Sequence, residues 1–259
     1  MQIVNESAAK KLVEMSKDEN CIYRFEWATS KKEFSIISAS QFFIGVMLDM
    51  RMKFNRAWEA GKHIVESHFN RDEIWYIISN KELSELEEIN RVGFGEKKHG
   101  KDFSGSYSGI NINFAKNLKS NAEKIVKVYK GDPRNIWNVS PNDVEIIYKR
   151  FIEFNGIGDA LAKMAQFLLV GKHGVAGGIK SKCFLKAKPD RHVCKVIKRL
   201  GLSETDKPKD VTKSIDDLDS DSQADIDAIL FNIGREFCFS TNPQCERCPF
   251  DNECAHNFS

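Results

Sequence analysis

The amino-acid sequence predicts an all-α protein, and two observations lead to that prediction. Apolar residues recur at helical spacing in most segments, as Val144, Ile147, Phe151 and Ile152 do near the middle of the chain. No run of residues has a convincing strand pattern, and no internal repeat is evident. With 259 residues, of which 41% are hydrophobic and 29% charged, the chain can bury a core as one large domain or two small ones.

The N-terminal half predicts a series of helices. Residues 1–20 predict a short helix, and residues 21–37 mix aromatic and β-branched residues that could hold a short extended segment. Residues 40–69 predict one long helix or two, with a buried, apolar first half. Residues 73–89 add a further helix or two. This part of the chain therefore predicts a helical core.

A glycine-rich loop is expected next, because residues 93–109 hold five glycines and few apolar side chains. Residues 111–128 then resume helical spacing, and Gly131-Asp132-Pro133 ends that helix.

The centre of the chain predicts a helical hairpin. Ser140-Pro141, with Asp143 three residues after the serine, is typical of a capped helix start. The helix breaks at Asn155-Gly156-Ile157-Gly158, and a second helix begins near Asp159. Glycines remove Cβ atoms from the turn and leave backbone N–H groups at a helix N-terminus, where an anion such as a phosphate can bind.

Charge is distributed unevenly after the hairpin. Residues 161–200 hold ten Lys or Arg and a single acid, Asp190. Residues 204–227 hold nine acids and three lysines. We expect the basic stretch to contact a polyanion and the acidic stretch to be solvated and turned away from it. Residues 170–188, with four glycines and several lysines, are expected to form a flexible insert.

Asp190 opens another helical segment, Pro189-Asp190-Arg191-His192-Val193, 32 residues after Gly158. Together with the hairpin, this segment resembles the helix-hairpin-helix (HhH-GPD) DNA glycosylases of the endonuclease III superfamily. The resemblance implies that Asp190 is the carboxylate needed to break the N-glycosidic bond of a flipped base. A simple helix N-cap is the alternative role for Asp190, and the two roles are compatible.

Four cysteines near the C-terminus carry the most specific motif. Their spacing, Cys238-x6-Cys245-x2-Cys248-x5-Cys254, resembles the iron–sulfur loop of the same superfamily. The resemblance implies a structural [4Fe–4S] cluster, with one thiolate on each iron. A four-cysteine zinc site and disulfides remain as alternatives. The other three cysteines are expected to be idle or buried thiols.

The resemblance also bears on the reaction. Bifunctional members carry a nucleophilic lysine two residues after the second glycine of the hairpin, where this chain has Ala160. Lys163, three residues further on, is offset around the helix. We therefore expect hydrolysis without strand cleavage. A lyase using a lysine of the insert and a non-catalytic iron–sulfur DNA-binding protein are the alternatives.

Further site residues follow from the same resemblance. Asp49, Ala160 and Gly45 are expected in the substrate pocket, where Gly45 replaces the glutamate of adenine-specific relatives. The expected DNA contacts are Gly156, Gly158, Arg51, Lys163, Lys188, Arg191 and His192.

The resemblance implies an endonuclease III-like fold of two domains. A helical barrel is expected over residues 38–168, with the hairpin at about 143–168. Residues 1–37 and 169–259 are expected to form a second domain that holds the cluster, with DNA in the cleft between the two. No apolar run approaches the roughly 20 residues that span a bilayer, and no signal-peptide block is evident. We expect a monomer that acts on double-stranded DNA in the cytoplasm, associated with the nucleoid, in base-excision repair or in defence against phage DNA with modified bases.

Overall fold

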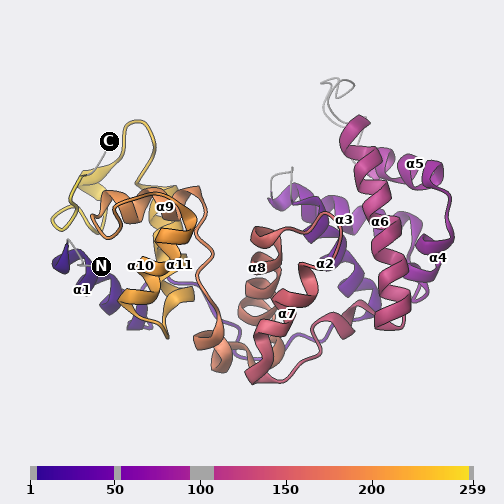
Figure 1. Ribbon diagram of the computed structural model, residues 1–259, viewed down its shortest axis with the longest axis horizontal. Coiled ribbons are helices and arrows are strands. Elements are labelled where there is room, and N and C mark those ends of the chain that lie inside the picture. The colour runs from indigo at the N-terminus through magenta and orange to yellow at the C-terminus, as the bar shows by residue number, and fades with distance from the viewer. Residues whose placement is uncertain (1–4, 50–53, 94–107, 257–259) are drawn as a thin grey trace. The chain divides into compact units, whose positions relative to one another are not determined.

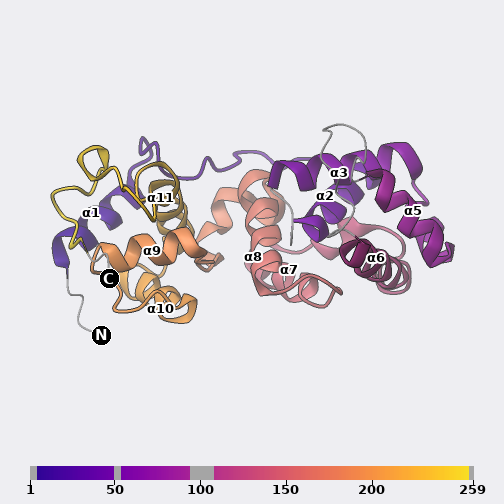
Figure 2. The ribbon, with the colours of Figure 1, turned by 90° about the horizontal axis from the view of Figure 1, so that it is seen from above.

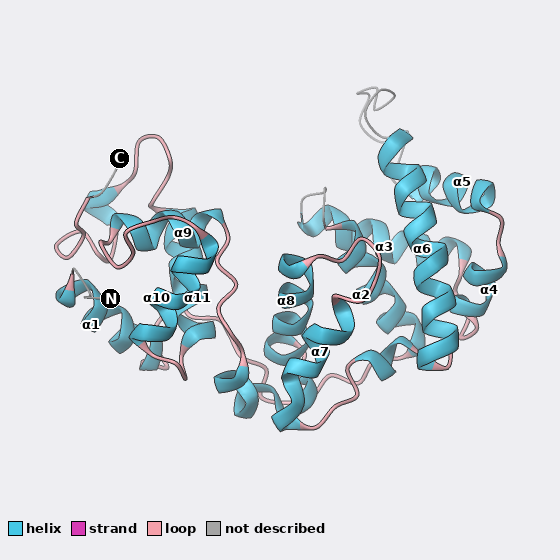
Figure 3. Ribbon diagram, viewed as in Figure 1, coloured by secondary structure: helices cyan, strands magenta, loops and turns pink. Residues whose placement is uncertain are grey.

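The structure, a computed structural model, describes residues 5–49, 54–93 and 108–256, and these residues form helices joined by turns and loops (Figure 3). No β-strand occurs within these ranges. The predicted all-α fold class is therefore confirmed. No helix in the described part of the chain is long and apolar enough to cross a membrane.

The chain divides into two compact units, with boundaries after Lys31 and after Gln166. The central unit comprises residues 32–166, and the terminal unit comprises residues 1–31 together with 167–259. The terminal unit therefore joins the two ends of the sequence. Figures 1 and 2 show α1, α9, α10 and α11 side by side within it.

The helices of the central unit follow one another along the sequence. They are α2 (Ile36–Leu48), α3 (Phe54–His68), α4 (Ile74–Asn80), α5 (Leu83–Gly93), α6 (Ser108–Tyr129), the 3₁₀ turns η1 (Pro133–Ile136) and η2 (Pro141–Asp143), α7 (Val144–Phe151) and α8 (Asp159–Phe167), whose last residue lies in the terminal unit.

The helices of the terminal unit come from both ends of the chain. They are α1 (Glu6–Lys17), the π turn η3 (Leu168–Lys172), the 3₁₀ segment η4 (Val175–Phe184), α9 (Arg191–Arg199), α10 (Pro208–Leu218), α11 (Gln223–Glu236) and the 3₁₀ turn η5 (Cys245–Arg247).

The central unit is built around α2, which packs against α3. Most of α2 is buried, as its apolar sequence predicts, and Phe43 contacts other rings edge-on or stacked. The buried indole N–H of Trp75 donates to Ser40 Oγ at 2.9 Å, so this polar group has a hydrogen-bond partner inside the core. Close packing of the two helices depends on Gly45, because a Cβ there would lie 2.3 Å from the ring of Trp58.

The terminal unit has its own apolar core, to which α1, α9, α10 and α11 contribute. Helices α9 and α11 approach closely at Gly234, where a Cβ would lie 2.8 Å from the Cβ of His192. The N-terminal helix is fixed by Asn5, whose Nδ2 donates to the carbonyl oxygens of Leu200 (2.8 Å) and Glu253 (2.6 Å). These bonds join the start of the chain to the end of α9 and to the cysteine loop.

Two local predictions differ from the structure, and a third is not tested by it. Residues 21–35 contain no strand. The predicted cap at Ser140 makes no side-chain hydrogen bond, because a 3₁₀ turn precedes α7. Most of the glycine-rich segment 93–109 lies outside the described residues.

The insert, whose glycines predicted flexibility, folds as η3 and η4. Ala176, Gly177 and Gly178 have positive φ at a kink within η4. Glycine is required at Gly174, whose added Cβ would lie 2.3 Å from the carbonyl oxygen of Ser30. The glycines therefore serve close backbone contacts.

Candidate functional site

The hairpin turn between α7 and α8 is held by side chains of α6. Asn121 pairs with the backbone of Asn155 twice: its Nδ2 donates to the carbonyl oxygen at 2.9 Å and its Oδ1 accepts the N–H at 2.8 Å. The next residue, Gly156, has φ +80, and Asn117 packs against the space that a Cβ would fill. The turn is therefore held by two hydrogen bonds and by this close packing, and Gly158 faces open space.

The start of α8 carries a small polar network. Tyr148 donates from its hydroxyl to Asp159 Oδ1 at 2.8 Å, and Lys163 pairs with Asp159 Oδ2 at 3.3 Å. The hydrogen bond to Asp159 raises the pKa of Tyr148 above its ordinary value, together with its desolvation. Lys163, a predicted DNA contact, is thus partnered within the hairpin, and Ala160 beside it is exposed.

Asp190 lies at the N-cap of α9, as predicted for a helix start. Its Oδ1 accepts the backbone N–H groups of His192 at 2.7 Å and Val193 at 3.0 Å. Its Oδ2 makes no hydrogen bond within the described part of the chain. The carboxylate is therefore fixed by one oxygen, and the other is available to a ligand.

The residues around Asp190 include the predicted basic contacts. Arg191 is exposed, and the Nζ of Lys188 lies 6.0 Å from the ring centre of Phe167. His192 points its Nδ1 at the carbonyl oxygen of Gly234, 3.2 Å away, and its ring meets Phe231 edge-on. His192 therefore contributes to the contact between α9 and α11.

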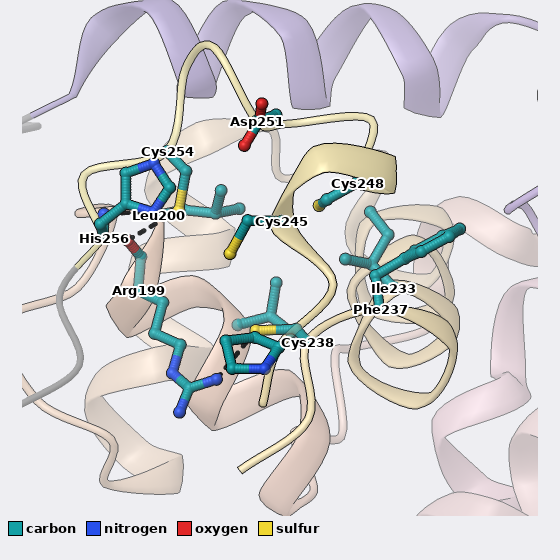
Figure 4. Close-up of a pocket in the computed structure, with 12 residues that line it drawn as sticks. Arg199, Leu200, Ile233, Phe237, Cys238, Cys245, Cys248, Asp251, Cys254 and His256 are labelled. Carbon is teal, nitrogen blue, oxygen red and sulfur yellow. Dashed lines mark hydrogen bonds between the residues drawn. The ribbon is translucent and has the colours of Figure 1, made fainter. Parts of the chain in front are cut away.

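The four motif cysteines line one pocket at the end of α9 and α11, and Figure 4 shows their sulfur atoms around a common space. Arg199 donates from Nη1 to Cys238 Sγ at 3.3 Å, and its guanidinium also donates to the carbonyl oxygens of Phe239 and Ser240. The backbone N–H of His256 donates to Cys254 Sγ at 3.4 Å. N–H donors to sulfur favour thiolates that bind metal.

Burial, together with negative charge on the other three motif cysteines, raises the pKa of Cys248 to about 11. The four sulfurs are thus close enough to repel one another as thiolates. No group of three or more His, Cys, Asp or Glu side chains within the described residues is arranged to hold a single metal ion. The four cysteines line the same pocket, but side chains can line one pocket without their sulfur atoms converging on a single point.

Two of the predicted substrate-pocket residues have structural roles in and around α2. Gly45 is buried beneath Trp58, which explains the glycine by packing. Asp49 is the C-cap of α2, with its N–H bonded to the carbonyl oxygen of Gly45. Arg51, a predicted DNA contact, lies outside the described residues.

Two residues that shape these sites were not predicted, Asn121 and Arg199. Asn121 occupies the same buried stripe of α6 as Leu118 and Ile125, and a polar residue at an apolar position is a usable signal. Arg199 sits among other basic residues of α9, so nothing in the sequence distinguishes it.

The fold is similar to those of solved DNA glycosylases. A non-covalent endonuclease III–DNA complex matches with a TM-score of 0.58 at 17% identity, covering 97% of this chain and 94% of that one. A trapped endonuclease III–DNA covalent intermediate gives 0.57 at 18%, with the same coverage. A thermostable thymine-DNA glycosylase gives 0.55 at 15%, covering 97% and 95%. The chain therefore has an endonuclease III-like fold.

No protein-family model matches the sequence, and no curated protein matches it.

Proposed function

We propose that this chain is a monofunctional DNA glycosylase, which hydrolyses the N-glycosidic bond of a damaged or modified base in duplex DNA and leaves an abasic site. Support comes from its endonuclease III-like fold and from the DNA-bound state of two of the similar structures. The observation that carries the proposal is Asp190, a carboxylate fixed at the start of α9 in the basic part of the chain.

The reaction requires a negative group near the sugar. Breaking the bond from C1′ to the base nitrogen passes through an oxocarbenium-like state, which a positioned carboxylate stabilises. The two backbone N–H groups on Oδ1 hold Asp190 in one orientation, so that Oδ2 would face C1′ or the attacking water. The base must leave the helical stack before this carboxylate can act.

The duplex backbone would be held by the hairpin. Backbone N–H groups at the start of α8, near Gly156 and Gly158, suit a phosphate because helix N-termini attract anions. Lys163, Lys188 and Arg191 would add sequence-independent phosphate contacts. Arg51 and His192 complete the proposed DNA contacts, and Asp49, Ala160 and Gly45 the proposed pocket.

The cysteine pocket would hold a [4Fe–4S] cluster through Cys238, Cys245, Cys248 and Cys254. The residues present suit this group: four sulfur donors line one space, and N–H groups of Arg199 and His256 point at two of them. When bound, the cluster would act as a structural cross-link of the C-terminal loop. The reaction steps proposed above use none of its redox chemistry.

Hydrolysis without strand cleavage follows from Ala160. A methyl group cannot attack C1′, so the hairpin position used by bifunctional relatives supplies no amine. Two insert lysines are already paired, Lys182 with Asp225 at 2.9 Å and Lys186 with Asp216 at 3.4 Å. These pairs disfavour either amine as a nucleophile.

The test is an excision screen with Asp190→Asn as the blank. Purified protein is incubated with duplexes carrying alkylated, deaminated or mismatched bases, and with phage DNA bearing modified cytosines. Abasic sites are scored by strand breakage with and without hot alkali. We expect DNA strand breakage only after alkali and only with the unmutated protein. The duplex that reacts identifies the substrate base.

Two results would change this proposal. A borohydride-trapped protein–DNA adduct would show a Schiff base and therefore a lyase. Tight, salt-dependent binding without excision on any duplex would indicate a non-catalytic DNA-binding protein. The identity of the substrate would also distinguish repair of chromosomal DNA from defence against phage DNA. In either case the proposed location of the protein is the cytoplasm, associated with the nucleoid.

A further inference from the structure

Helix α11 begins with three buried polar side chains at alternate positions. Gln223 and Asp225 are each 1% exposed, and Asp227 is 5% exposed. The sequence predicted this acidic stretch to be solvated, so their burial is a correction. Burying carboxylates is costly unless they accept hydrogen bonds, so each of these side chains is expected to serve a particular contact.

Asp225 serves the insert and the N-terminal segment. Its carboxylate accepts from the indole N–H of Trp27 at 2.7 Å and pairs with Arg24 and Lys182. This network joins η4 and the N-terminal segment to α11. Among the described residues, no hydrogen bond or ion pair joins Asp225 to residues 187–190.

Gln223 and Asp227 serve the segment that leads to Asp190. They lie one turn apart on the same face of α11. Gln223 Oε1 accepts the backbone N–H of Ala187 at 3.2 Å, and Asp227 Oδ1 accepts the N–H of Lys188 at 3.1 Å. Two consecutive amides are therefore bound by one helix face.

The Gln223 side chain is itself held in one orientation. Its Nε2 donates to Asp216 Oδ1 and to the carbonyl oxygen of Ser220. The amide oxygen must then face Ala187, since the nitrogen is already committed. Ala187 is fully buried in the apolar core of the terminal unit.

We infer that Gln223 and Asp227 are positioning residues for the carboxylate of Asp190, an inference that rests on the proposed function. Asp190 follows Lys188 by two residues, with Pro189 between them limiting the backbone. The carboxylate of Asp190 is thus oriented directly by the backbone amides of α9. The backbone that precedes it is held by Gln223 and Asp227 on α11. Misplacing a reacting group by about 1 Å can slow a reaction about 100-fold.

The test compares Asp227→Ala, Gln223→Ala and Asp227→Asn in the full-length, cluster-loaded protein. Single-turnover excision of the duplex identified in the screen is measured beside the dissociation constant for that duplex. We expect the two alanine variants to excise about 10- to 100-fold more slowly, with the dissociation constant changed less than about twofold. Asp227→Asn keeps an acceptor oxygen and should restore most of the rate.

Asn232→Ala is the matched control. Asn232 is also on α11, and its side chain donates to the carbonyl oxygen of Tyr23 at 2.9 Å, away from Asp190. It should retain the full excision rate. If Asn232→Ala slows excision as much as Asp227→Ala does, or if the alanine variants excise normally, the positioning role is wrong.

Hydrogen exchange gives a readout that needs no substrate. The amides of Ala187 and Lys188 should be protected in the unmutated protein and should exchange faster in the matching alanine variant. Unchanged protection would overturn the inference even if excision slowed. If the unmutated protein excises no base at all, the proposed function fails and the positioning role fails with it, whereas normal excision by every variant overturns only the positioning role.

Discussion

At the scale of single residues, Asp190 has two roles that separate by substitution. Asparagine is as good an N-cap as aspartate, because its side-chain oxygen also accepts backbone N–H groups. It carries no charge, however, and cannot stabilise a cationic transition state. Asp190→Asn should therefore fold normally and bind duplex DNA while losing excision.

Asp190→Ala should lose both roles. Removing the acceptor for the His192 and Val193 amides should lower the free energy of unfolding by about 1 kcal/mol. Denaturant unfolding followed by circular dichroism measures this difference. Equal stability of the alanine and asparagine variants would mean that the two hydrogen bonds to Oδ1 do not form in solution.

Ala160 allows a gain-of-function prediction. The side chain is exposed on the first turn of α8, so a long residue should be tolerated there. Ala160→Lys should yield a borohydride-trapped adduct with substrate DNA that the unmutated protein does not give. Ala160→Arg is the control, since it adds the same charge without a nucleophilic amine. Trapping by neither variant would place Ala160 outside reach of C1′.

At the scale of elements, the two glycines of the hairpin serve different purposes. Gly156 has φ +80, and an added Cβ would lie 2.6 Å from Asn117 Nδ2. Gly158 has open space in place of a Cβ. The first glycine is therefore needed to fold the turn, and the second is available for close approach of a phosphate.

This difference gives a matched pair of variants. Gly156→Ala should lower the free energy of unfolding by about 1–2 kcal/mol, because the alanine is forced into a left-handed conformation. Gly158→Ala should leave stability unchanged and weaken duplex binding several-fold, because its methyl group would separate the backbone from the phosphate. Urea unfolding and fluorescence anisotropy measure the two effects. Normal DNA binding by a folded Gly158→Ala protein would argue against this turn as a phosphate site.

The glycines of the insert fit two different structural interpretations. Glycines are common both in flexible loops and where backbones touch, and spacing alone does not distinguish these cases. Here Gly171 lies against the ring of Phe25 and Gly178 against the carbonyl oxygen of Ala28. The partners come from a segment more than a hundred residues away in sequence, which is why these contacts were not predicted.

At the scale of the whole molecule, the proposed cluster should join the ends of the terminal unit. The cysteine loop is bonded to α9 through Arg199 and to the N-terminal helix through Asn5 and Lys11. Loss of the cluster should therefore destabilise both the cysteine loop and its contacts with α9 and α1.

Cys248→Ser tests this expectation. We expect the variant to lose bound iron and visible absorbance, and to unfold at lower denaturant concentration, because a cysteine ligand is missing. Cys183→Ser is the control, since Cys183 does not line the pocket and should leave iron content unchanged. Zinc in place of iron in the purified protein would establish the four-cysteine zinc site instead.

Features that depend on short spacing could be predicted from the amino-acid sequence. Helical periodicity predicted the all-α class, the Asn155–Gly158 break predicted the hairpin, and Pro189-Asp190 predicted the start of α9. The spacing of the last four cysteines predicted that they belong to one loop, and the four side chains line one pocket, whereas the [4Fe–4S] cluster itself stays a prediction. Each of these features is set by residues within a few turns of one another.

Features that depend on distant partners became visible in the folded chain alone. Asn121 holds a turn 34 residues away, Asp225 pairs with Arg24 across 201 residues, and Gln223 binds an amide 36 residues before it. A carboxylate or amide has the same sequence signature whether it is solvated or buried against such a partner. The physical reason is that burial and hydrogen bonding are fixed by the folded chain, whereas periodicity and turn chemistry are local.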